Sequence, residues 1–277
     1  MLNSTEARLA ESTVDADLLD RGGVGLAVQG WRATITLNRP DRLNAQTPLT
    51  WQALREIGQR LDPEVRVVVV RGAGRAFSAG LDRRLFTSAE VDGAPGLAAL
   101  AERPTEQADA DIAGFQQGFS WLREPERVTI AAVQGHAIGA GFQLALACDL
   151  RVVADDARFR MAETGLGLVP DLGGTLPLVK AVGYARAVEI CLTGREVPAE
   201  EALRLGLANA VVPGERLDVA VDELAEAVAQ PPRTAVRETL ELLVQADEAV
   251  DPEQQLAEER AAQLRCIAEL AERFGAP

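Results

Sequence analysis

One stretch, from Ala131 to Thr175, constrains the fold of this chain more than any other. A mostly apolar run, Val128 to Val133, leads into it and is long enough for one buried strand. Three glycines then precede the apolar face of a helix: Gly135, Gly139 and Gly141. Glycines between a strand and a helix let the backbone approach a ligand closely, and the helix start points unbonded N–H groups at it. The pattern predicts a strand–turn–helix unit with a binding site at the turn.

Two carboxylates follow this turn. A second short strand is expected from Arg151 to Ala154, and Glu163 and Asp171 come after it with no basic residue between them. Carboxylates beside a turn rich in N–H donors indicate acid–base chemistry on a substrate that develops negative charge on oxygen.

The composition excludes several classes of protein. The 277 residues, 47% apolar and 25% charged, fit one large domain or a core with a helical appendage. No apolar run approaches the ~18 residues of a membrane span, and the N-terminus lacks the pattern of a secretory signal. Three scattered cysteines favour reduced thiols in a cytoplasm. A net charge of −14 without a basic run argues against nucleic-acid binding.

The remaining chain predicts alternating strands and helices, followed by helices alone. Residues 1–22 are polar and acidic and predict a tail with at most one loose helix. Residues 84–110 lack a regular pattern and predict a lid or a mobile loop. Strands are expected at 25–28, 33–37 and 66–71, and helices at 49–61, 111–122, 176–192, 199–205, 217–229, 233–246 and 252–274.

Four motifs in order identify a family resemblance that runs from about Gly25 to Pro213. They are ITLNRPDRLNA, RAFSAGLD, the stretch described above, and TGREVPAEEALRLGLANAVVP. Together they resemble the crotonase superfamily, also called the enoyl-CoA hydratase/isomerase family. The resemblance implies an α/β fold, a spiral of repeated ββα units at 23–197 after the tail at 1–22. It also implies a helical trimerisation region at 198–277, with a homotrimer or a dimer of trimers as the assembly.

The resemblance also implies an oxyanion hole for a thioester enolate. Its two donors are backbone N–H groups, which fall on Leu81 and on Ala140, where the family more often has glycine. Glu163 matches a carboxylate that moves protons at carbon beside the thioester. Its apolar neighbours favour a raised pKa.

Two further positions bear on the reaction. Gln143 stands where family hydratases usually carry a second Glu, and an amide orients a water molecule without taking its proton. Asp171 resembles the Asp of some family isomerases, although it is equally explained as a cap of the following helix. The hypothesis is therefore an acyl-CoA enzyme, with double-bond isomerisation slightly favoured. The alternatives are a one-acid hydratase and a non-catalytic acyl-CoA-binding subunit.

Coenzyme A is expected as part of the substrate, with no separate cofactor. One histidine, His136, is too few for a His-based metal site, and no P-loop or dinucleotide fingerprint occurs. By resemblance, the candidate contacts to coenzyme A are Arg42, Leu43, Ala79, Gly80, Arg83, Arg84, Gly139 and Gly141.

Overall fold

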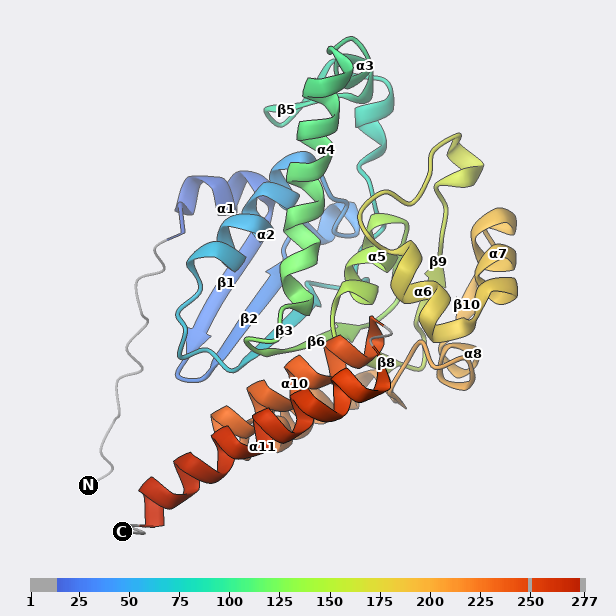
Figure 1. Ribbon diagram of the computed structural model, residues 1–277. Helices are drawn as coiled ribbons and strands as arrows, with labels where there is room; N and C mark the ends of the chain where they lie inside the picture. The colour runs from blue at the N-terminus through green and yellow to red at the C-terminus, as the bar shows by residue number, and fades with distance from the viewer. Residues whose placement is uncertain (1–13, 249–250, 275–277) are drawn as a thin grey trace, which may run out of the picture.

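A six-stranded sheet forms the centre of the computed structural model, which describes residues 14–248 and 251–274 (Figure 1). Its order is β1-β2-β3-β6-β8-β11; β1 and β2 are antiparallel, and every other neighbouring pair is parallel. The strands are β1 (Val24–Gln29), β2 (Arg32–Leu37), β3 (Val67–Gly72), β6 (Val128–Val133), β8 (Leu150–Ala154) and β11 (Ala210–Val212).

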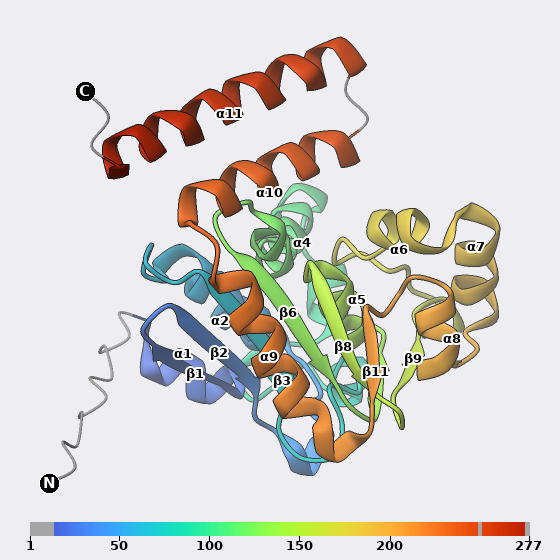
Figure 2. The ribbon, with the colours of Figure 1, turned by 90° about the horizontal axis from the view of Figure 1, so that it is seen from below.

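The central strand β3 shows how the sheet is buried on both faces. Val68 and Val70 belong to one apolar core, whereas Val67 and Val69 belong to another. Successive side chains of a strand point to opposite faces, so one β-branched run supplies both cores. The first core contains side chains from α2 (Pro48–Arg60), α4 (Thr105–Ser120) and α5 (Ala140–Ala147). The second lies under α9 (Leu217–Ala229), which crosses the opposite face in Figure 2.

The stretch that led the sequence analysis forms one strand–strand–helix unit. The chain leaves β6, makes β7 (His136–Ile138), and enters α5 directly after Gly139. Every residue of α5 is buried, which agrees with a sequence that is apolar except for Gln143. In a three-stranded sheet of order β10-β9-β7, β7 lies beside β9 (Arg158–Arg160) and β9 beside β10 (Val197–Pro198). Glu163 follows β9, so this small sheet brings the acidic segment beside the start of α5.

The N-terminal region is more ordered than the predicted tail. Residues 1–13 lie outside the described residues, but α1 (Ala16–Gly22) is a helix that begins after the N-cap Asp15. Leu18 is buried, and Thr50 of α2 donates a hydrogen bond to the Gly22 carbonyl at 2.7 Å. Residues 14–22 therefore pack with the core.

The prediction of an irregular 84–110 segment was wrong in part. It contains a short hairpin of β4 (Glu90–Val91) and β5 (Ala94–Pro95), then α3 (Leu97–Ala101) and the start of α4. The turn Asp92-Gly93 has positive φ at both residues, which is the backbone of a two-residue hairpin. Val91 and Ala94 are buried, so side-chain burial holds the hairpin in place.

The helices after residue 198 were predicted closely. The predicted helix at 176–192 is instead two helices that meet at Gly183, and strands β10 and β11 were not predicted. The additional helices are α6 (Thr175–Val182), α7 (Tyr184–Thr193), α8 (Ala199–Arg204), α10 (Arg233–Asp247) and α11 (Pro252–Phe274), with 3-10 turns at 40–42, 83–86, 121–123, 164–166 and 214–216. β11 pairs with β8, and α9 packs on the sheet. Val236 and Leu240 of α10 pack against the second core, and α11 lies on the outer side of α10 (Figure 2). Over the described ranges, no helix has the length and apolar character needed to cross a membrane.

Candidate active site

Most of the predicted site residues surround a cavity of about 350 Å³ between the turn at Gly80, the start of α5 and the segment that contains α3; Arg42, Leu43, Arg84 and Gly141 do not line it. Its walls are mostly apolar, and few polar side chains reach it, which is the usual character of a small-molecule site. The lining residues include the candidates Ala79, Gly80, Leu81, Arg83, Gly139, Ala140, Gln143, Glu163 and Asp171.

Two glycine turns meet at one end of this cavity. Gly80 has a φ of +81°, and a Cβ built on it would lie 2.4 Å from the Ile138 carbonyl oxygen and 3.5 Å from the Ala140 nitrogen. Gly141 packs equally closely on Ser78. These contacts leave no room for a side chain, so the glycines allow the two turns to touch.

The amide groups of Leu81 and Ala140 are free to bind a ligand. Gly80 and Asp82 bond to Gln46 on either side of Leu81, and the first hydrogen bond of α5 runs from the Gln143 N–H to the Gly139 carbonyl. Among the described residues, no acceptor takes the N–H of Leu81 or Ala140. Two unbonded N–H groups on adjoining turns, one of them at a helix N-terminus, are the kind of donors that stabilise a developing oxyanion.

Glu163 lines the cavity and has one carboxylate oxygen without a hydrogen-bond partner in the described part of the chain. The side chain is 9% exposed, and its Oε1 accepts a hydrogen bond of 2.7 Å from Gln143 Nε2. Its Oε2 is buried without a hydrogen-bond partner. Burial raises the pKa of Glu163 above its ordinary value, with hydrogen bonds opposing the shift and the nearby Asp171 adding to it. Glu163 also lies beside the turn at Gly139, because a Cβ on Gly139 would be 3.2 Å from Oε1.

Gln143 holds Glu163 in place. The amide is 1% exposed, and its Oε1 accepts the N–H groups of Leu172 at 2.9 Å and Gly174 at 3.3 Å. With its oxygen engaged by backbone donors, the side chain can turn only its Nε2 towards Glu163. Gln143 therefore orients the carboxylate and has no group that takes a proton.

Asp171 lines the mouth of the same cavity. Its side chain is exposed by surface area, yet the surrounding apolar wall raises its pKa through desolvation. Gln116 of α4 donates a hydrogen bond of 2.7 Å to the Asp171 carbonyl and fixes the segment that carries it. No helix-capping bond from the Asp171 side chain occurs, since α6 begins four residues later with Gly174 at its N-cap.

The first group of candidate coenzyme A contacts lies beside the turn at Gly80. The Ala79 N–H donates a hydrogen bond of 2.8 Å to the Leu43 carbonyl, which joins the loop at 40–46 to that turn. Leu43 has a φ of +50°, so the chain folds back on itself here. The Arg42 side chain points to solvent.

The two adjacent arginines differ sharply in their surroundings. Arg84 pairs with Asp82 at 2.7 Å and with Asp92 at 2.8 Å, so its charge is already neutralised. Arg83 is exposed, lines the cavity and forms no ion pair with any described residue. Arg83 is thus the better placed of the two for a phosphate group.

Several lining residues were not found from the sequence. Phe86, Leu97 and Leu100 come from the segment that was predicted to be irregular, and Ile112 and Phe115 come from α4. The Asp-Gly dipeptide at the hairpin was the available signal for order in this segment.

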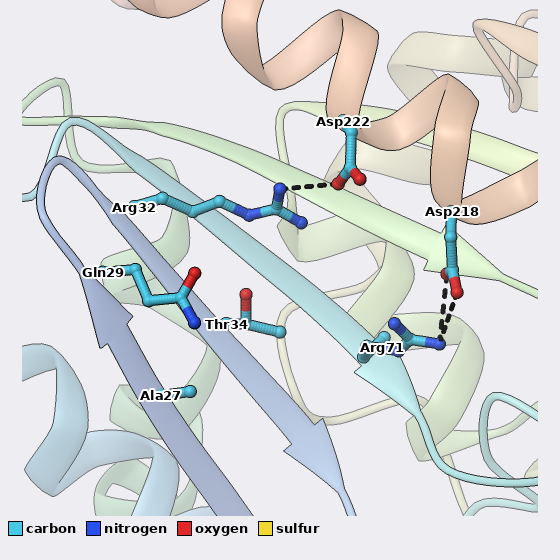
Figure 3. Close-up of a pocket in the computed structure, with 7 residues that line it drawn as sticks. All are labelled: Ala27, Gln29, Arg32, Thr34, Arg71, Asp218 and Asp222. Atoms are coloured by element: carbon cyan, nitrogen blue, oxygen red, sulfur yellow. Dashed lines mark hydrogen bonds and ion pairs between the residues drawn. The ribbon is translucent and has the colours of Figure 1, made fainter. Parts of the chain in front are cut away.

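A second cavity, of about 260 Å³, lies on the opposite face of the sheet (Figure 3). Its charged groups are paired, Arg32 with Asp222 at 2.6 Å and Arg71 with Asp218 at 3.1 Å, and these pairs tie α9 to β2 and β3. No described residue there combines a free acid with free N–H donors, so this cavity lacks the chemistry of the first. Across residues 14–248 and 251–274, no three His, Cys, Asp or Glu side chains cluster as metal ligands would.

Comparison with known proteins shows the family of this chain. The profile of the enoyl-CoA hydratase/isomerase family matches residues 32–273. A probable enoyl-CoA hydratase of Mycobacterium bovis is 34% identical over 228 residues, 82% of either chain. The carnitinyl-CoA dehydratase of Proteus mirabilis is 38% identical over 214 residues, 76% of either chain. The chain belongs to the enoyl-CoA hydratase/isomerase family.

The solved structures confirm the predicted fold class. A putative enoyl-CoA hydratase from Thermobifida fusca in complex with CoA is 48% identical, with a TM-score of 0.88 over 93% of this chain and 98% of that one. The same protein in complex with acetoacetyl-CoA also gives 48% identity and a TM-score of 0.88, over 92% and 99%. This chain therefore has the mixed α/β crotonase fold with C-terminal helices.

Proposed function

We propose that this protein binds an acyl-CoA thioester and moves a carbon–carbon double bond along its acyl chain. The thioester oxygen sits between the N–H groups of Leu81 and Ala140. As a proton leaves the neighbouring carbon, negative charge develops on that oxygen, and each N–H then bonds it more strongly. In other enzymes the loss of one such donor costs about 3–4 kcal/mol of transition-state stabilisation.

Glu163 is the acid–base group of the proposal, and its free Oε2 is the observation that carries it. This oxygen takes the C2 proton of a 3-enoyl thioester, and the electron pair spreads into a dienolate. The raised pKa suits the task, because a general base works best when its pKa is near the working pH. Gln143 keeps the carboxylate in one orientation throughout.

Asp171 is the second carboxylate. In its protonated form it delivers a proton to C4, which leaves the conjugated 2-enoyl thioester. Asp171 then recovers a proton from solvent, and Glu163 releases the proton that it took from C2, so both groups return to their starting state. Its position at the mouth of the cavity supports this exchange, and its raised pKa supports the protonated form.

Hydration is the second candidate, and the names of the relatives favour it. Proteins named enoyl-CoA hydratase and carnitinyl-CoA dehydratase resemble this chain over most of its length. In a one-acid hydratase, Glu163 activates the water and Gln143 only orients it. The absence of a second acid at Gln143 favours isomerisation.

Coenzyme A is then bound as part of the substrate. We assign the phosphates to the free guanidinium of Arg83 and to Arg42, and the pantetheine to the joined backbone segments of Leu43 and Ala79. The exposed apolar side chains of α11 support self-association as a trimer or a dimer of trimers: Leu256, Leu264, Ile267 and Leu270.

The test follows the ultraviolet absorbance of 2-enoyl-, 3-enoyl- and 3,5-dienoyl-CoA thioesters. If the wild-type protein brings the double bond of an enoyl thioester into conjugation, and neither Glu163→Gln nor Asp171→Asn does so, the result supports the two-carboxylate isomerase. Asp109→Asn, on the exposed surface of α4, is the matched control and keeps wild-type rates.

Two other outcomes would overturn the proposal. Hydration of the 2-enoyl thioester that needs Glu163 but not Asp171 identifies a one-acid hydratase. If the protein binds thioesters tightly without turning them over, and Glu163→Gln changes only the affinity, the protein is a binding subunit.

A further inference from the structure

Four charged side chains form a network behind the turn that carries Gly80 and Leu81, which we call the oxyanion turn. Asp82 accepts hydrogen bonds from Arg84 Nη2 at 2.7 Å and from Arg39 Nη2 at 3.2 Å. Asp92 accepts from the same two groups, at 2.8 Å from Arg84 and 3.0 Å from Arg39. Asp82 is 5% exposed, and its pKa is lowered to about 2, first by the hydrogen bond from Arg84 and with help from the charge of Arg39. Asp82 therefore stays ionised at neutral pH.

Asp82 follows the oxyanion turn directly, and Arg39 belongs to the loop that packs against it. Asp82 directly follows Leu81, and its N–H donates to the Gln46 carbonyl at 2.8 Å. Arg39 Nη1 donates to the Ala45 carbonyl at 2.7 Å, and the Arg39 N–H donates to Asn44 Oδ1 at 2.9 Å. One end of the network thus holds the Leu81 N–H and the loop before α2 in register.

Asp92 belongs to a different part of the molecule. It occupies the turn of the β4–β5 hairpin, where its φ is +53°. The hairpin closes with a hydrogen bond of 2.8 Å from the Gly96 N–H to the Ala89 carbonyl, and α3 begins at the next residue. Leu97 and Leu100 of α3 line the apolar wall of the cavity. A shift of Asp92 is therefore a shift of the wall against which an acyl chain packs.

We infer that Asp82 and Asp92 are positioning residues, and that the Arg39–Asp82–Arg84–Asp92 network couples the oxyanion turn to the wall of the acyl pocket. The inference rests on the proposed acyl-CoA function. It also gives Arg84 a role other than contact with a phosphate, because both of its neighbours are acids within 2.8 Å. A long acyl chain that orders α3 then also steadies the Leu81 N–H, whereas a two-carbon acyl group does not reach α3.

Asp92→Asn is the first test, because Asp92 is partly exposed and its loss is compatible with folding. The variant removes two charge pairs from the hairpin and leaves Asp82 in place. Partly exposed pairs contribute about 0.2–1 kcal/mol each, so the combined loss corresponds to a change of about two- to thirtyfold in affinity. Calorimetry with decanoyl-CoA is expected to show this loss, and acetyl-CoA less than a twofold change. Equal losses for both thioesters would overturn the coupling.

Asp82→Asn is expected to act on turnover. With Arg39 and Arg84 left under-compensated, the Leu81 N–H moves, and kcat falls about tenfold to a hundredfold with a smaller change in KM. A rise in KM with kcat unchanged would contradict a role at the oxyanion turn. Arg84→Gln is expected to lower kcat in the same way. Arg84→Lys keeps the positive charge and is expected to retain part of the kcat that Arg84→Gln loses.

Hydrogen exchange tests the coupling without any ligand, so it remains decisive if the proposed reaction fails. Asp92→Asn is expected to speed exchange at residues 88–101 and also at the Asp82 and Gln46 N–H groups, which bond across the oxyanion turn. Glu201→Gln is the matched control, because it likewise removes the negative charge of an acid that is paired with an arginine, here Arg195, in another part of the fold. Faster exchange confined to 88–101, or equal exchange in both variants, would refute the inference.

Discussion

The contact between the two glycine turns gives a quantitative prediction for Gly80→Ala. Gly80 has a φ of +81°, and the new Cβ would lie 2.4 Å from the Ile138 carbonyl oxygen. Ordinary contacts between carbon and a carbonyl oxygen are about 3.3–3.6 Å long. Both sides of the clash are backbone, so neither can rotate away. The two turns must separate by roughly 1 Å, and the Leu81 and Ala140 amides separate with them.

This displacement affects both stability and turnover. A non-glycine residue at positive φ costs about 1–2 kcal/mol, and forcing an extra methyl into a packed site costs about 1–3 kcal/mol more. The free energy of unfolding should therefore fall by about 2–5 kcal/mol. If Leu81 no longer reaches the oxyanion, kcat falls by about 10²–10³.

Gly30→Ala is the matched control. Gly30 also has positive φ, +55°, but a Cβ there would meet nothing within 4 Å. The control should lose only the backbone cost of about 1–2 kcal/mol and keep wild-type kcat. Urea unfolding and the thioester assay measure the two quantities on the same samples. A folded Gly80→Ala protein with wild-type kcat would refute the assignment of these two turns as the oxyanion hole.

Three further predictions concern Glu163, Gln143 and the surface of α11. Burial raises the pKa of Glu163, so the folded state keeps a proton that the unfolded chain has already released; stability falls as pH rises from the unfolded to the folded pKa. Glu163→Gln removes this loss, and its urea-unfolding stability relative to wild type should rise with pH across that window; a constant difference contradicts the shift. Gln143→Glu should raise the ratio of hydration to isomerisation, measured by product analysis, and an unchanged ratio argues against orientation of water at this position. Leu264→Asp with Ile267→Asp should lower the mass found by light scattering, since both side chains are exposed on α11; an unchanged mass places self-association elsewhere.

The parts of the fold that were predictable are those whose signal is local. The run RVVVVR predicts a strand buried on both faces, and Val67 to Val70 indeed divide between two cores. The helices of the C-terminal region were predicted within a residue or two, because apolar spacing and proline mark their ends. The turn before α5 was found because glycines stand between a strand pattern and a helix pattern.

The parts that were not predicted depend on partners distant in sequence. β11 has only three residues, too few for a periodic signal, and becomes a strand because β8 offers an edge. The charge of Arg84 is consumed by Asp82 and by Asp92, eight residues further along, which no local pattern reveals. Likewise, the sequence places Gln143 and Glu163 twenty residues apart and gives no sign of their hydrogen bond.

The late position of β11 matters for synthesis on the ribosome. Strands β1 to β8 are complete by Ala154, but the neighbour of β8 is made only when Val212 has emerged. Until then, the backbone of a strand that carries Val152 and Val153 has one unpaired side, the kind of template on which chains aggregate. A nascent or truncated chain that stops before Ala210 is therefore an aggregation hazard even though it contains every residue of the proposed catalytic site. The last short strand thus protects the whole sheet.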